Sequence, residues 1–237
     1  MDIHLISYGN EKYAFQREFF KRNALASGFF DTVTVFSQAD LANDFKKQYQ
    51  DILALSRGAG YWIWKPYLVK KVLESLSEGD ILIYCDSGCM INRRAKKRFQ
   101  EYIDILINAE SHTLGFELDH REEEYTKAEV FEYLKSPESI KQTKQLIGGI
   151  LFFQKSVSST KLVERWNEVL KVEPLLFTDE LTPTMQHVDF KGHRHDQSIF
   201  SIIRKTHGTA TLADETYFND FVREGQDFPI WATRLSG

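Results

Sequence analysis

A short apolar run near the middle of the chain limits the possible folds more than any other feature of the sequence. Residues 81–85 read Ile-Leu-Ile-Tyr-Cys, follow Gly79 and lead directly into Asp86. A run of this length, rich in β-branched and aromatic side chains, is typical of a strand buried on both faces of a sheet. Asp86 then lies at the carboxyl end of a central strand, where open α/β sheets bind their ligands.

Asp86 has two interpretations. An aspartate directly after a strand often begins an Asx-turn, in which its side chain bonds to the backbone and has no further role. At the carboxyl edge of a sheet, the same carboxylate would instead face a bound phosphate ester, directly or through a metal ion. The short segment by itself favours the turn, so the choice depends on what the rest of the chain brings to this edge.

Strands and helices alternate along the rest of the chain. Apolar periodicity predicts strands at residues 3–7, 32–36, 81–85, 113–117 and 147–153. It predicts helices at residues 11–26, 37–49, 66–76, 93–106, 159–170 and 196–205. This alternation indicates the α/β class, with a mainly parallel central sheet flanked by helices. Residues 171–195 are expected to form a long loop, and residues 208–237 have no clear period, although residues 231–234 are placed to fold back on the site.

Length and composition exclude several classes of protein. The 237 residues suit one α/β domain, and the net charge of −4 gives no general attraction to nucleic acids or membranes. There are only two cysteines, Cys85 and Cys89, so we expect a reducing compartment and neither a disulfide framework nor a zinc site. No run approaches 18 apolar residues and the first residues do not resemble a signal peptide, so we expect a cytoplasmic protein.

Small and polar residues occur where several of the predicted strands begin or end. They are Ser7 and Tyr8, Asp86 with Ser87 and Gly88, Glu117 with Asp119, and Gly148 with Gly149. Because the carboxyl ends of parallel strands lie along one edge of a sheet, we expect these clusters to converge in one crevice. Their convergence is the main argument from the residues for a binding site, since no single motif is specific enough.

The order and spacing of these segments resemble the nucleotide-sugar glycosyltransferases of the GT-A fold across roughly residues 1–205. Residues 57–66 are similar to the segment before the metal motif of that superfamily, and residues 81–88 to its apolar strand ending in a DxD motif. Residues 148–150 are similar to the glycine turn beside the donor sugar, and residues 195–200 to the Asp-Gln helix start near the reacting centre.

The resemblance implies a single GT-A-like domain over residues 1–237. Residues 1–110 would form the nucleotide-binding half, and residues 111–237 the acceptor-side half with a C-terminal tail. It implies transfer of a sugar from a nucleotide diphosphate donor, with a UDP-sugar favoured, to a hydroxyl of a glycan or glycoconjugate. The implied donor-binding residues are Ser7, Tyr8, Arg57, Trp64, Lys65, Tyr84, Asp86, Ser87, Gly148 and Gly149.

The sequence departs from the family pattern in its metal motif. A full DxD has two carboxylates, but here only Asp86 is acidic. Gly88 takes the second position if Asp86 is the first acid, and Tyr84 takes the first position if Asp86 is the second. The family implies Mn²⁺ or Mg²⁺, and one carboxylate still suffices when phosphate oxygens and waters complete the shell. His193 or His195 would supply a further ligand and favour Mn²⁺; the alternative is a polar loop without a ligand.

Each remaining candidate also has a structural interpretation. Cations such as Arg57 and Lys65, with Arg234 as an outside choice, would stabilise charge on the leaving diphosphate, or they are ordinary surface charges. Tyr8 would stack on the nucleobase or pack on the sheet edge, and Trp64 would contact the sugar or belong to the core.

Four residues are candidates for catalysis. Asp196 would bind sugar hydroxyls beside Gln197, or it is only a helix N-cap. Glu117 and Asp119 would serve as the general base of an inverting reaction, or they form the acidic start of a helix. The sequence resembles retaining members somewhat more, and it leaves the stereochemical outcome open.

Two other functions are compatible with the same fold. A sugar nucleotidyltransferase would carry a glycine-rich basic loop after the first strand, which residues 7–11 are not. A non-catalytic nucleotide-sugar-binding module would explain the missing second acid. A dehydrogenase is disfavoured because no G-x-G-x-x-G follows the first strand.

Overall fold

The apolar run at residues 81–85 forms the central strand β3 (Ile81–Cys85), and all five of its residues are buried. A computed structural model of the chain describes residues 1–182 and 185–234. In it, a seven-stranded sheet has the order β2-β1-β3-β7-β5-β6, with β8 also paired to β5. The other strands of this sheet are β1 (Ile3–Tyr8), β2 (Thr32–Phe36), β5 (Thr113–Arg121), β6 (Lys144–Leu146), β7 (Ile150–Gln154) and β8 (Ala210–Ala213).

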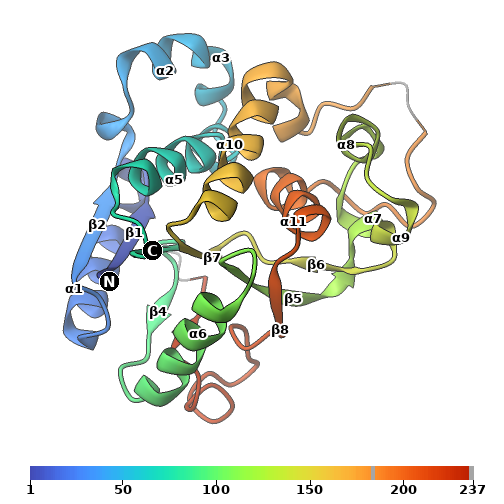
Figure 1. Cartoon of the computed structure of the whole chain (residues 1–237). Coiled ribbons are helices and arrows are strands. Elements are labelled where there is room, and N and C mark those ends of the chain that lie inside the picture. Colours follow the sequence, from blue (N-terminus) through green and yellow to red (C-terminus); the bar gives the residue numbers. More distant parts are fainter. Residues whose placement is uncertain (183–184, 235–237) are drawn as a thin grey trace.

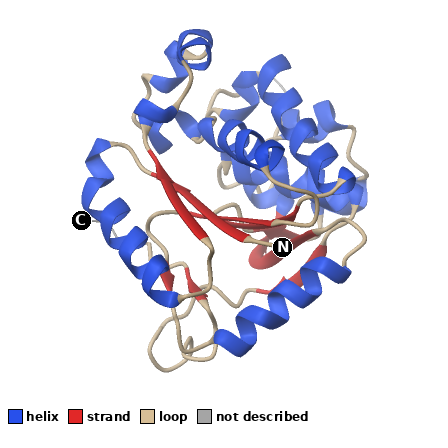
Figure 2. Cartoon of the chain, turned by 60° about the vertical axis from the view of Figure 1, so that its left-hand side comes forward, coloured by secondary structure: helices blue, strands red, loops and turns tan. Residues whose placement is uncertain are grey.

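Helices cover both faces of the sheet (Figures 1 and 2). Alternate residues of β3 enter two separate cores, as the two-residue period of a strand requires. Ile81 and Ile83 pack with α1 (Ala14–Ser27) and α6 (Lys96–Asn108). Leu82 and Tyr84 pack with α5 (Trp64–Ser75), α10 (Val157–Val172) and α11 (His195–His207). The predicted α/β class, with helices flanking a central sheet, is confirmed.

The sheet is mixed, where we expected it to be mainly parallel. The pairs β1–β2, β1–β3 and β5–β8 are parallel, while β7 is antiparallel to both β3 and β5, and β6 is antiparallel to β5. β6 and β7 pair with successive parts of β5, as if they were one antiparallel strand interrupted at residues 147–149. The sequence did not reveal this, because a buried apolar strand reads the same in either direction.

Short helices and turns connect these elements. Gly28 ends α1 with a left-handed φ of 69°, and Ser156 caps α10 by accepting a hydrogen bond from the Ser159 N–H. The helix expected at residues 37–49 is divided into η2 (Gln38–Asp40) and α2 (Asn43–Gln48), followed by α3 (Gln50–Leu53). The remaining short helices are η1 (Glu11–Tyr13), α4 (Gly58–Tyr61), α7 (Glu122–Tyr125), α8 (Ala128–Leu134), α9 (Glu138–Lys141) and η3 (Pro174–Phe177).

The tail, for which the sequence showed no period, contributes two strands. β8 extends the main sheet, and β9 (Ile230–Trp231) pairs with β4 (Met90–Ile91), which directly follows the Asp86 turn. The Thr233 hydroxyl donates a hydrogen bond of 2.7 Å to the Gly88 carbonyl. The tail therefore folds back on the end of β3, as expected. In the described part of the chain, no helix has both the length and the apolar character needed to cross a membrane.

Candidate active site

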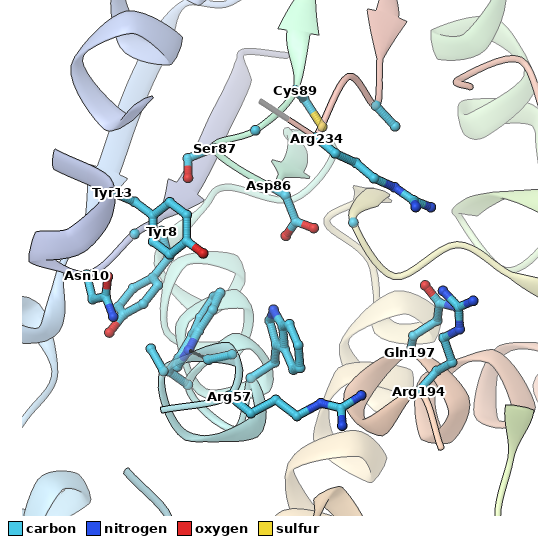
Figure 3. Close-up of a pocket in the computed structure, with 18 of the residues that line it drawn as sticks. Tyr8, Asn10, Tyr13, Arg57, Asp86, Ser87, Cys89, Arg194, Gln197 and Arg234 are labelled. Carbon is cyan, nitrogen blue, oxygen red and sulfur yellow. Dashed lines mark hydrogen bonds between the residues drawn. The ribbon is translucent and has the colours of Figure 1, made fainter. Parts of the chain in front are cut away.

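A cavity of about 1020 Å³ lies where β1 and β3 end (Figure 3). Distant parts of the chain form its wall: the end of β1, the segment before α5, the turn after β3, β5, the start of α11 and the tail. Of the residues predicted for the site, those on the wall are Tyr8, Arg57, Trp64, Asp86, Ser87, Asp119, Gly149 and Gln197. Lys65, Asp196 and Gly148 are not on the wall, but they contact one another behind it, and Lys65 also reaches Asp86.

Asp86 is half-exposed at the centre of this cavity. Its Oδ1 accepts a 2.5 Å hydrogen bond from the Tyr84 hydroxyl, and its backbone N–H donates to the Gly149 carbonyl at 2.8 Å. Its Oδ2 has no hydrogen-bond donor among the described residues. The backbone and one oxygen are thus fixed, and the other oxygen is available to a ligand.

Lys65 joins three of the predicted residues from behind the wall. Its ammonium lies 2.6 Å from Asp196 Oδ2 and 3.7 Å from Asp86 Oδ1, and it donates to the Gly148 carbonyl at 3.0 Å. Burial lowers the pKa of Lys65, but the two carboxylates outweigh burial and the pKa is raised. Burial raises the pKa of Asp196 to about 6, against the lowering effect of Lys65. The buried pair of Lys65 and Asp196 is thus joined to the half-exposed carboxylate of Asp86.

The glycine turn between β6 and β7 allows a close approach at this point. A Cβ on Gly149 would lie 2.6 Å from Asp86 Oδ2, and a Cβ on Gly148 would lie 2.6 Å from the Gln197 Cβ. Any larger residue would therefore displace Asp86 or the start of α11. The turn is next to Asp86 because β7 runs antiparallel to β3, so that the amino end of β7 meets the carboxyl end of β3.

Gln197 is held by a buried chain of polar side chains that the sequence did not indicate. Its Oε1 accepts from the Gly148 N–H at 2.9 Å, and its Nε2 donates to Gln145 Oε1 at 2.6 Å. Gln145 in turn donates to Glu122 Oε2 at 3.0 Å, and Lys205 donates to Glu122 Oε1 at 2.8 Å. Gln145 and Glu122 are fully buried. This polar relay fixes which way the Gln197 amide faces.

Aromatic rings form the other end of the cavity. Tyr8 and Trp64 stack with ring centroids 3.8 Å apart, and the indole N–H of Trp64 donates to the Gly58 carbonyl at 3.0 Å. Asn10 and Tyr13 lie on the same side of the cavity in Figure 3. Ser7 is buried beside this end and is not part of the wall.

The structure does not bring His193 and His195 to Asp86. Both are buried, neither is on the cavity wall, and a ring nitrogen of each bonds to a backbone carbonyl, of Leu176 at 2.8 Å and Phe177 at 3.0 Å. Burial lowers the pKa of His193 well below its usual value and that of His195 to about 4. Both imidazoles are therefore neutral near pH 7.

Glu117 and Asp119 lie within β5, which continues to Arg121 where we expected the strand to end at residue 117. Glu117 is not on the cavity wall. Asp119 is on the wall, and its side chain is 97% exposed and lies 3.0 Å from Lys144 Nζ. In the described residues, one group of three possible metal ligands occurs elsewhere, formed by Glu123, His187 and Asp189.

Similarity to known proteins is found by comparing structures and not by comparing sequences. No protein-family model matches the sequence, and no curated protein matches it. A crystal structure described as a glycosyltransferase involved in the glycosylation of the major capsid of PBCV-1 has a TM-score of 0.53 at 10% identity, covering 98% of this chain and 92% of that one. The fold is that of the GT-A glycosyltransferases.

A second solved structure with a similar fold is that of the galactosyltransferase LgtC. Its complex with donor and acceptor sugar analogs has a TM-score of 0.50 at 9% identity, and an active-site mutant of LgtC has 0.52 at 10%. Each alignment covers 96% of this chain and 86% of LgtC.

Two further arginines line the cavity: Arg194, which the sequence did not indicate, and Arg234, which it offered only as an outside choice. Arg194 precedes α11 and lies beside Gln197, and Arg234 in the tail lies beside Cys89 (Figure 3). Their guanidinium groups rest on the rings of Tyr125 and Tyr217, at 4.4 Å and 5.3 Å. Arg57 differs, because it pairs with Asp179 at 2.8 Å. In the sequence, Arg194 lies between His193 and His195, whose imidazoles are typical metal ligands, and no pattern marks the arginine itself as part of a site.

Proposed function

We propose that this protein is a glycosyltransferase that moves a sugar from a nucleotide diphosphate donor, most simply a UDP-sugar, to a hydroxyl of a glycan or glycoconjugate. The observation that carries the proposal is the gathering of Asp86, Lys65, the Gly148–149 turn and Gln197 around one cavity of a GT-A fold. The cytoplasmic location expected from the sequence stays a prediction.

The order of residues along the cavity suits such a donor. The nucleobase would lie against Tyr8 and Trp64, and the diphosphate would lie at Asp86, next along the sheet. The sugar would follow at Gly149 and Gln197, which lie next to Asp86 on the cavity wall. The acceptor would enter beyond Gln197. At about 1020 Å³ the cavity is at the upper limit of usual ligand sites, which supports the presence of two substrates.

Fixed positive charges would stabilise the leaving nucleoside diphosphate. Arg234 lies beside Cys89 on the cavity wall, and no hydrogen-bond acceptor for its guanidinium is found among the described residues; Arg57 is on the same wall. Negative charge develops on the diphosphate as the sugar leaves, and cations already oriented toward it lower the barrier. Lys65 acts from behind the wall by holding Asp86 and Asp196 in place.

The side chain of Asp86 fits a divalent ion. Its free Oδ2 would hold the ion, together with donor phosphate oxygens and waters, in the way that Mg²⁺ is usually bound. When bound, the ion would neutralise phosphate charge. Because the His193 and His195 rings face backbone carbonyls, the supporting ligands are all oxygens, which suits Mg²⁺ at least as well as the Mn²⁺ that an imidazole would favour.

Gln197 and Asp196 would act on the sugar itself. The polar relay holds the Gln197 amide between the Gly148 N–H and Gln145, and at this place on the cavity wall Gln197 would contact the donor sugar. Asp196 is paired with Lys65 and would align sugar hydroxyls only if a ligand displaced part of that contact. Asp119 remains the candidate for a general base on the acceptor side of the wall.

The direct test is calorimetric binding of UDP, followed by turnover of common UDP-sugars with Mg²⁺ or Mn²⁺. We expect UDP to bind, donor hydrolysis or transfer to be detectable, and EDTA to weaken UDP binding. Asp86→Asn should abolish the effect of EDTA and lower turnover by roughly 10²–10³-fold while the melting temperature stays nearly unchanged.

Three results would count against the proposal. Failure of every common nucleotide sugar to bind would remove it. Tight binding without turnover, with any acceptor, would favour the non-catalytic binding module. Pyrophosphate release from a nucleoside triphosphate would favour the sugar nucleotidyltransferase.

A further inference from the structure

We propose that the acceptor end of the cavity binds an anionic group, a carboxylate or phosphate on the acceptor sugar, through the guanidinium of Arg194. The inference rests on the proposed function, because that function orders donor and acceptor along the cavity. It adds the chemical class of the acceptor, which neither the motifs nor the fold supplies.

The position of Arg194 assigns it to the acceptor. Its carbonyl accepts a hydrogen bond of 3.1 Å from the Gln197 N–H, so it lies one turn before the residue that faces the donor sugar. In Figure 3, Arg194 and Gln197 are on the side of the cavity away from Tyr8, with Asp86 between the two sides. A nucleoside diphosphate that begins at Tyr8 reaches Asp86 first, and Arg194 lies beyond the sugar.

The guanidinium of Arg194 is oriented but has no polar partner. It rests on the Tyr125 ring at 4.4 Å, and no side chain or carbonyl among the described residues accepts a hydrogen bond from it. Stacking leaves the N–H groups at the edge of a guanidinium free, and their fork matches a carboxylate or a phosphate. The backbone of Arg194 is fixed as well, since its N–H donates to the Tyr125 carbonyl at 3.0 Å and to Ser198 Oγ at 3.1 Å.

The nearby carboxylates do not neutralise Arg194. Asp119 pairs with Lys144 at 3.0 Å, and Glu124 pairs with Lys191. The pKa of the neighbouring His120 is lowered by burial and by the positive charge of Arg194, against the raising effects of Gln145, Glu124 and Glu122. Because Asp119 and Glu124 already have cationic partners, the guanidinium of Arg194 presents its own positive charge on the cavity wall, which suits an anion rather than a neutral sugar.

The test compares sugars that differ only in charge. Protein saturated with UDP is titrated with glucose, glucuronate and glucose 6-phosphate, and binding is followed by NMR. We expect at least one of the two anions to bind about tenfold or more tightly than glucose, as a charge-assisted bidentate contact provides. Arg194→Gln should remove this difference and leave UDP affinity within about twofold, and Arg194→Lys should retain only part of it.

Matched variants separate the possible outcomes. Arg234→Gln should weaken UDP binding and leave the preference for anions unchanged. A preference for glucuronate alone, or for glucose 6-phosphate alone, identifies the anion as a carboxylate or a phosphate.

Equal binding of all three sugars, or a preference that survives Arg194→Gln, overturns the inference. Loss of UDP affinity in Arg194→Gln would move Arg194 to the donor. Absence of UDP binding to the unaltered protein would overturn the proposed function and the acceptor assignment together.

Discussion

Lys65 is an unusual lysine because its side chain is buried, with only 3% of its surface exposed. A buried ammonium is unfavourable unless opposite charges and hydrogen bonds surround it. Asp196, Asp86 and the Gly148 carbonyl provide these contacts, and they come from three different elements. At the scale of single residues, this ammonium therefore joins the turn after β3, the glycine turn and the start of α11.

Replacing Lys65 by Met should leave two carboxylates facing each other without a cation. We expect Lys65→Met to lower the free energy of unfolding by about 3–5 kcal/mol, the usual effect of removing one partner of a buried ion pair. Urea unfolding measures this loss. Lys70→Met on the same helix is the control: Lys70 pairs with Glu74 at the surface, so the change should be below about 1 kcal/mol. Equal losses in the two variants would contradict the role given to Lys65.

The buried His195 should make the protein less stable in acid. Burial lowers its pKa to about 4, while the unfolded chain takes up this proton near the usual value of 6.5. The unfolded state therefore binds more protons than the folded state between these values, and stability is lost as the pH falls from about 6.5 to about 4. Asp196, with its pKa raised to about 6, acts in the opposite sense, because its folded form gains a proton as the pH falls through about 6.

A single variant isolates the contribution of His195. The residue has a φ of 55°, which asparagine tolerates, so His195→Asn removes the titration without straining the backbone. Between pH 6.5 and 4, we expect His195→Asn to lose about 3 kcal/mol less stability than the unaltered protein, as measured by urea unfolding at each pH. An unchanged slope would mean that His195 is protonated in the folded protein.

At the scale of elements, the site depends on how α11 packs against the interrupted strand β6–β7. The glycine turn lets the first residues of α11 come within contact distance, and the polar relay from Glu122 through Gln145 then fixes Gln197. The relay crosses from α7 to β6 to α11, so each element orients a side chain that belongs to the next.

Breaking the relay should affect the reaction more than donor binding. Gln145→Leu keeps the size of the side chain but removes the contact that orients Gln197, which in the proposed function contacts the sugar and not the nucleotide. We expect kcat for UDP-sugar turnover to fall about tenfold or more, with KM for the donor within about threefold. Gln48→Leu, on the exposed face of α2, is the control and should change neither value. A rise in KM with unchanged kcat would contradict this role for the relay.

At the scale of the whole molecule, the C-terminal tail closes the cavity. It carries β8 into the main sheet, pairs β9 with β4 and brings Ala232 and Arg234 to the cavity wall. Glu215 anchors it, accepting hydrogen bonds from Arg98 Nη2 and the Tyr102 hydroxyl of α6, each at 2.6 Å. The cavity wall is thus completed by residues from both ends of the chain.

Loosening this anchor should expose the tail without unfolding the sheet. We expect Glu215→Ala to lower the free energy of unfolding by about 1–3 kcal/mol, because Arg98 and Tyr102 lose their acceptor. Hydrogen exchange should become faster in residues 214–234 and stay unchanged in β1 and β3, and UDP affinity should fall because Arg234 is less well positioned. Uniformly faster exchange in every strand would show that the tail is not a separate closing element.

The sequence by itself determined the α/β class, the buried central strand ending at Asp86, the glycine turn and the Asp-Gln start of the last long helix. These features are local, because a strand, a turn and a helix start each depend on a few neighbouring residues. Their order along the chain was enough to indicate the GT-A fold.

Only the tertiary structure decided the direction of β7, the ion pairs of Lys65, the position of His193 and His195 away from Asp86, and the arginines on the cavity wall. Each of these depends on residues that are far apart in sequence, such as Lys65 and Asp196, or Arg98 and Glu215. A charged residue looks the same in a sequence whether it faces water, a buried partner or a ligand, and only its neighbours in space distinguish these cases.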